Sequence, residues 1–99
     1  MSVGVLKAKQ ITASGLITGR RAYFKQLIMH HASGGDAVIN FYDLTTAPQG
    51  GEPYYSFDVY GKGFTSMSLV DPGVLFDDGI YVTFDVVTDI TITVLYEEV

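Results

Sequence analysis

The sequence predicts an all-β domain, specifically a jelly-roll-like antiparallel β-sandwich of about eight strands. Along most of the chain, apolar side chains alternate with polar ones at a period of two, as on a strand with one buried face. These segments are rich in Val, Ile, Thr, Tyr and Phe, which suit a pleated sheet surface. Glycines and prolines interrupt the chain roughly every 8–14 residues, a spacing typical of sandwiches and barrels. No segment has the sustained apolar spacing of an amphipathic helix.

Four strands are predicted in the first half of the chain. Residues 4–12 alternate only weakly, so the register of this strand is poorly specified. Residues 15–19 form a short strand bounded by glycines. Residues 20–31 are the best helix candidate, but no helical face is cleanly apolar. Tyr, Phe and Ile favour a strand, which is predicted at residues 21–32. In residues 37–44, an isoleucine and a phenylalanine alternate with an asparagine and a tyrosine.

The second half contains the clearest alternation. Residues 54–60 alternate aromatic and aliphatic with polar side chains, and residues 79–87 and 90–97 each carry a regular apolar stripe. Shorter strands are predicted at residues 63–70 and 74–77. The apolar faces define a predicted core made of Ile39, Phe41, Phe57, Val59, Ile80, Val82, Phe84, Ile92 and Val94.

The connections are predicted from their turn residues. Residues 45–53 contain two prolines and a glycine pair, and we expect this long loop to be exposed. Asp78 and Gly79 separate two apolar runs, which indicates a tight turn or bulge in which glycine supplies a positive φ. No linker or repeat divides the chain, so residues 1–99 are expected to form one domain, with residues 1–13 as an N-terminal arm or an edge strand.

The composition excludes several classes of protein. Eleven acidic and six basic residues give a net charge of −5, the opposite of what a phosphate-neutralising nucleic-acid binder needs. With no cysteine, the chain has no disulfide, thiolate chemistry or cysteine-ligated zinc. No secretory signal or membrane-spanning run is visible, so no membrane partner is expected. The hydrophobic fraction of 47% is generous for so small a domain and predicts that apolar surface is buried in an oligomer.

Two residue groups raise the question of a metal ion. His30 and His31 are adjacent on a predicted strand, so they point to opposite faces and cannot chelate one ion together. One of them could join Asp36 or Asp43, but ordinary surface or interface histidines are favoured. The aspartates before Gly79 lack the spacing of a calcium loop and are interpreted as turn residues. We therefore expect no metal and no cofactor.

Catalytic chemistry is not supported by the sequence either. Ser33 lies near His31 and Asp36, which are the residue types of a catalytic triad. These residues fall within one glycine-rich turn, without the context that positions a nucleophile. The protein is therefore not expected to be an enzyme.

The remaining candidates are interaction residues. Arg20 and Arg21, with Lys25, form a small basic cluster that could meet a phosphate or an acidic partner, or simply be a solvated strand end. A sugar-stacking face could be formed by Tyr42, Tyr54, Tyr55 and Tyr60, but tyrosine is also enriched in protein interfaces, and tryptophan is absent. The residues predicted to make contacts with partners are Val5, Leu6, Arg20, Arg21, Tyr54 and Tyr60.

The order of turns and strands resembles that of small β-sandwich virion proteins of tailed bacteriophages. The resemblance covers the chain from about residue 15 onward. It is carried by the Phe-Tyr-Asp-Leu-Thr strand end at residues 41–45, the Phe-Asp-Asp-Gly-Ile-Tyr-Val hairpin at residues 76–82 and the closing strand at residues 90–97. It implies a structural role in the virion as a capsid decoration or cement protein, or as a neck or tail accessory. It implies no catalytic residues.

The expected partners follow from this resemblance and from the composition. The protein is expected to form a homo-oligomer, most simply a trimer, and to bind the phage major capsid protein or another virion protein after synthesis in the host cytoplasm. The N-terminal segment would add to a neighbouring sheet edge, or alternatively form the first strand of its own sandwich. A carbohydrate-binding β-sandwich module is the alternative from a different functional class.

Overall fold

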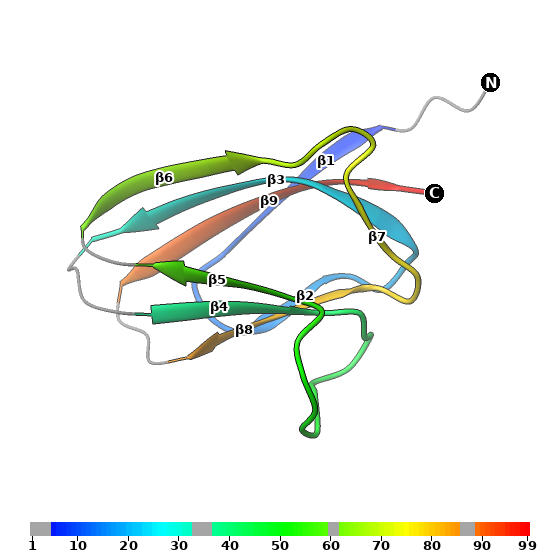
Figure 1. Cartoon of the computed structure of the whole chain (residues 1–99), viewed down its shortest axis with the longest axis horizontal. Helices are drawn as coiled ribbons and strands as arrows, with labels where there is room; N and C mark the ends of the chain where they lie inside the picture. The colour runs from blue at the N-terminus through cyan, green and yellow to red at the C-terminus, as the bar shows by residue number, and fades with distance from the viewer. Residues whose placement is uncertain (1–4, 33–36, 60–61, 86–88) are drawn as a thin grey trace.

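A computed structural model describes residues 5–32, 37–59, 62–85 and 89–99. Within these residues the chain forms nine strands and no helix, arranged as two antiparallel sheets packed face to face (Figure 1). The all-β sandwich predicted from the sequence is therefore confirmed. The described segments accordingly contain no helix that could span a bilayer.

Every predicted strand has a counterpart in the structure. The first sheet has the order β1-β9-β3-β6, made of Leu6–Ile11, Ile90–Glu98, Ala22–His31 and Gly63–Ser68. The short strand β7, Val74–Phe76, pairs with the beginning of β3. The second sheet has the order β2-β8-β4-β5, made of Gly15–Thr18, Ile80–Asp85, Ala37–Tyr42 and Tyr55–Val59.

The strand order is that of a rolled-up ribbon. Strands β1 and β9, β2 and β8, β3 and β6, and β4 and β5 all pair antiparallel, so the chain resembles one long hairpin that reverses between β4 and β5. Rolling the ribbon brings β9 beside β3 and β8 beside β4, which divides the pairs between two sheets. Strand β7 is an addition that continues the edge of the first sheet beyond β6.

The core lies between the sheets and was largely predicted. Of the nine predicted core residues, all except Phe84 are buried, and Phe84 is half-buried against the core. The centre is aromatic: Phe24 stacks on Phe41 with ring centroids 4.6 Å apart, and Phe57 meets both rings edge-on. Phe24 and Phe76 were absent from the prediction, because their strands show no simple alternation that separates a buried from an exposed face.

Two local expectations are corrected by the structure. His30 and His31 do point to opposite sides of β3, but His31 is buried, not a surface residue. Gly79 does not adopt a positive φ. Instead, a Cβ at Gly79 would lie 2.6 Å from the Thr18 carbonyl oxygen and 3.0 Å from that of Leu44, so close backbone approach is what requires glycine.

Candidate functional site

Five of the six predicted interaction residues lie at one end of the sandwich. We call this region the terminal end because β1 begins and β9 ends there, at the right of Figure 1. The loop between β4 and β5 projects downward from the same half of the molecule. Tyr60, the sixth residue, is outside the described residues. The terminal end comprises residues 5–7, 18–22, 43–54, 77–79 and 97–99.

Backbone pairing brings together the start of β1, the turn that contains Arg21 and the end of β9. Leu6 is opposite Glu97 in the β1–β9 ladder, and Ala22 is opposite Glu98 in the β3–β9 ladder. The Val99 amide then donates to the Arg21 carbonyl oxygen over 3.0 Å. The N-terminal strand and the arginine turn, although distant in sequence, are therefore held against the same end of β9.

Tyr54 joins this region from the long loop. Its ring meets Phe76 edge-on with centroids 4.9 Å apart, and its amide donates to the Phe41 carbonyl oxygen over 2.8 Å. Next to Phe76, Asp77 faces the Arg21 Nε at 3.4 Å. Tyr54 is thus oriented by the core on one side while 55% of it remains exposed.

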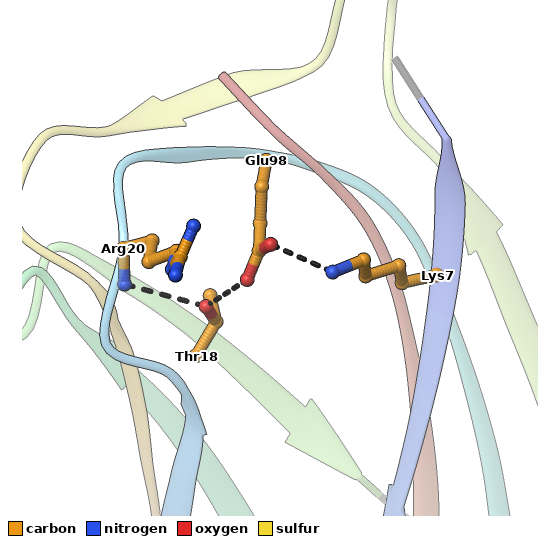
Figure 2. Close-up of polar contacts among 4 residues, drawn as sticks. All are labelled: Lys7, Thr18, Arg20 and Glu98. Carbon is orange, nitrogen blue, oxygen red and sulfur yellow. Dashed lines mark hydrogen bonds and ion pairs between the residues drawn. The ribbon is translucent and has the colours of Figure 1, made fainter.

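A polar cluster centred on Glu98 joins three strands at the terminal end (Figure 2). The Lys7 Nζ of β1 lies 2.7 Å from Glu98 Oε1, and the Thr18 hydroxyl of β2 donates to Oε2 over 2.6 Å. The Arg20 amide in turn donates to the Thr18 hydroxyl oxygen over 3.3 Å. These contacts make Glu98 the polar link between the edge of the first sheet and the edge of the second.

The same contacts favour the charged form of Glu98. The hydrogen bond from Lys7, followed by that from Thr18, holds the pKa of this carboxyl below its ordinary value of 4.5. A carboxyl whose pKa is depressed on folding stabilises the native state above its unfolded pKa, and this contribution is lost as the pH falls through the folded pKa.

We predict that Glu98→Gln weakens the protein near neutral pH by about 0.5–1 kcal/mol, and that the difference shrinks in acid below the ordinary pKa. Urea unfolding at pH 7 and pH 3 measures both effects. Glu52→Gln, in the exposed part of the long loop, makes the same change of charge and is the matched control. An equal loss at both pH values would contradict an electrostatic role for Glu98.

The basic cluster predicted from the sequence is divided among carboxylates. Arg21 faces Asp77, as above, while Lys25 lies 3.3 Å from Glu97 and 3.7 Å from Asp71. Arg20 lies close enough to Glu98 to help lower the pKa of that carboxyl. With acidic groups beside each of these three cations, the cluster does not present the concentrated positive charge that a phosphate requires.

Asp43 organises the turn that the sequence marked as a possible calcium site. Its carboxylate accepts backbone hydrogen bonds from Asp77, Asp78 and Gly79 at 3.1, 2.7 and 3.3 Å. The turn was expected, but the carboxylate that accepts these bonds comes from the end of β4, not from the turn itself. Among the residues that the structure describes, no three possible ligands lie together as a metal site would require. Ser33 and Asp36 of the considered triad fall outside the described residues.

Of the four tyrosines considered for sugar stacking, Tyr60 lies outside the described residues, and Tyr42, Tyr54 and Tyr55 do not share one face. Tyr55 is opposite Phe41 in the ladder and stacks on Phe57 with centroids 4.8 Å apart, so it lies on the inner side of the second sheet. Tyr42 follows Phe41 in the same strand and therefore points to the outer side, opposite Tyr81. Tyr54 lies beyond the sheet, at the terminal end.

The surface of the described residues carries shallow hollows open to solvent. One of about 280 Å³ lies on the outer side of the first sheet, lined by Leu6, Lys25, Gln26, Leu95 and Glu97. Another, at the opposite end of the sandwich, is lined by Thr12, Ala13, Ser14, Phe84 and Asp89. Small-molecule sites usually enclose most of their ligand, which neither hollow does. Neither hollow therefore has the geometry of an enclosed small-molecule site.

No protein-family model, curated protein or solved structure matches this chain.

Sequence reasoning missed the roles of Glu98, Thr18 and Asp43 at the terminal end, although Asp43 was considered as a metal ligand. Each acts through a partner more than thirty positions away in the sequence. The adjacent glutamates near the C-terminus were a visible feature, but their partners depend on which strands the fold places beside β9. For Asp43, the only indication was its position at the end of an alternating segment.

Proposed function

We propose that this protein is a non-enzymatic structural component of a bacteriophage virion, a capsid decoration or cement protein that binds other virion proteins through the terminal end. The observation that carries the proposal is that Val5, Leu6 and Tyr54, each more than half exposed, lie at the same end of the sandwich, where ion-paired charges also lie. Apolar and aromatic anchors surrounded by polar groups are typical of protein interfaces.

The architecture also supports this proposal. The rolled-ribbon order of the strands is what we interpret as jelly-roll-like, an arrangement that recurs in viral capsid and lectin domains. Since a fold alone does not define a function, the resemblance of the turns and strands to phage virion proteins is what favours the virion over other roles.

The two alternative roles, a neck or tail accessory protein and a carbohydrate-binding module, differ in how well the structure supports them. A neck or tail accessory protein would use the same kind of surface, so it remains within the proposal as an alternative location. A carbohydrate-binding module is disfavoured because Tyr42 and Tyr55 lie on opposite sides of the second sheet. Retention on a sugar column would favour that role over the one proposed.

The proposal is tested with particles purified from the phage that encodes the chain. Mass spectrometry is expected to detect the protein in fixed proportion to the major capsid protein. The double variant Leu6→Ser, Tyr54→Ala should fold but lose at least about tenfold in affinity for particles that lack the protein, because two anchors are removed.

Leu16→Ser is the control, since Leu16 is an exposed apolar residue on β2, outside the terminal end. Absence of the protein from purified particles would contradict the virion role. Equal loss of binding in the control variant would contradict the role of the terminal end.

A further inference from the structure

The edge strands β1, β2, β5 and β6 differ in how they oppose pairing with another chain. Native edges are commonly protected by inward charges, short length, bulges, proline or charged side chains. On β1, Lys7 and Lys9 share the face of the inward residues of β9. Strand β2 has four residues and an irregular register, and β5 follows Pro53 and carries Asp58.

Strand β6 has none of these protections. Its six residues, Gly-Phe-Thr-Ser-Met-Ser, include no charge and no proline, and they pair with β3 in a regular register. The Leu69 amide continues this ladder by donating to the Lys25 carbonyl oxygen over 2.9 Å. Because backbone groups alternate in direction along an antiparallel strand, those of Phe64, Ser66 and Ser68 point away from β3. A regular row of donors and acceptors is therefore open to another strand.

Exposed apolar side chains lie at both ends of this edge. Val70, just beyond β6, is 89% exposed, and Phe64 is 77% exposed, the two highest values among the exposed large hydrophobic residues of the described chain. The Phe64 ring stacks on His30 with centroids 4.4 Å apart, so it is already held on the outer side of the sheet. Burying both residues against a partner would remove from water the two large hydrophobic side chains with the highest exposed fractions in the described chain.

We propose that β6 pairs antiparallel with β6 of a second copy of this chain, about a two-fold axis that passes through Ser66. In this register, Ser66 is opposite itself and Phe64 is opposite Ser68, so every outward backbone group of one copy meets one of the other. Phe64 of each copy also lies diagonally from Val70 of the other, within reach of an aromatic side chain. The first sheets of the two copies join into one continuous sheet.

The charges beside this edge favour a second copy as the partner. The same register brings Lys62, which precedes β6, close to Asp71 of the second copy, which follows its β6, and symmetry repeats the contact. The Asp71 side chain is 96% exposed and has only a 3.7 Å contact with Lys25. Copies with a net charge of −5 repel each other in general, so an uncharged strand flanked by opposite charges is a suitable place for them to meet.

This pairing goes beyond the virion role and does not depend on it. A two-fold contact is closed and uses the same residues in both copies, so it yields a dimer in place of the trimer expected from the sequence. Its residues are distinct from those of the terminal end. Loss of self-association and loss of particle binding are therefore separate outcomes.

The first test measures the mass of the purified protein by light scattering over a range of concentrations. We expect the mass of two chains for the natural sequence. Phe64→Ser should raise the dissociation constant about a hundredfold, since the contacts of two phenylalanine rings are lost. Leu16→Ser makes a similar apolar-to-polar change at an exposed position of β2 and should leave the dimer intact.

The second test places a charge on the two-fold axis. Ser66→Lys brings two lysines opposite each other and should weaken the dimer about fivefold or more. Ser56→Lys adds the same charge to the exposed edge strand β5 and is the matched control. Hydrogen exchange should show concentration-dependent protection of the Phe64, Ser66 and Ser68 amides, which the Ser66→Lys variant loses. Circular dichroism verifies that each variant is folded.

A mass of one chain at all concentrations, or a mass of three chains, would overturn the proposal. So would a dimer that Phe64→Ser and Ser66→Lys do not weaken, or that the two control variants weaken equally. Unchanged exchange of the three outward amides across the concentration range would also overturn it, whatever the mass.

Discussion

Replacing Phe41 with alanine is expected to lower the free energy of unfolding by about 3–5 kcal/mol. Phe41 has no exposed surface, stacks on Phe24 at 4.6 Å and meets Phe57 edge-on at 5.5 Å. Removing its ring leaves a cavity between the sheets that the surrounding strands cannot close without breaking their ladders. Urea unfolding followed by circular dichroism measures the loss.

Phe84→Ala is the comparison variant, because it makes the same change at a less buried position. Sequence alternation placed Phe84 in the core with Phe41, but the structure leaves it only half-buried. Its replacement is therefore expected to cost about 1–2 kcal/mol, since less apolar area returns to water. Equal losses at the two positions would show that the aromatic cluster around Phe41 is not the centre of the core.

Gly73→Ala is expected to cost about 3 kcal/mol, the second large effect. Gly73 has a φ of +105°, which residues with a side chain rarely adopt, and a Cβ there would collide with the Phe24 carbonyl oxygen. The alanine variant must therefore move β7 away from β3 or strain both segments. Thermal unfolding provides the comparison with the natural protein.

Gly50→Ala separates the two causes. Gly50 has a similar φ of +117°, but its added Cβ would meet no atom within 4 Å. Only the conformational penalty applies there, so we expect a loss of about 1 kcal/mol. If both variants lost the same stability, contact with the Phe24 carbonyl would not be what requires glycine at residue 73.

The Phe41 and Gly73 predictions together test whether the stability of the core and that of the first sheet's edge are coupled. Phe24 stacks on Phe41 through its side chain and limits residue 73 through its carbonyl oxygen. β3 therefore serves both as a wall of the core and as the support for β7. A change at either site is expected to be transmitted to the other through β3.

The sequence by itself determined the strands and most of their buried faces. A strand with one face in the core must alternate in polarity, whichever strands it pairs with, so Ile39 and Val82 could be assigned to the core without knowing the topology. The same alternation correctly placed His30 and His31 on opposite sides of their strand. Glycine and proline positions marked the turns for an equally local reason.

Only the tertiary structure decided what the side chains at strand ends and edges contact. Glu98 meets Lys7 and Thr18 because β9 lies between β1 and β3 and ends beside β2, and local polarity contains no information about that order. His31 is buried because its strand extends into the core, although histidine by itself favours the surface. The unprotected edge at β6 likewise became visible only when the pairing of all nine strands was known. Alternation is a property of one strand, whereas an edge or an ion pair is a property of how several strands meet.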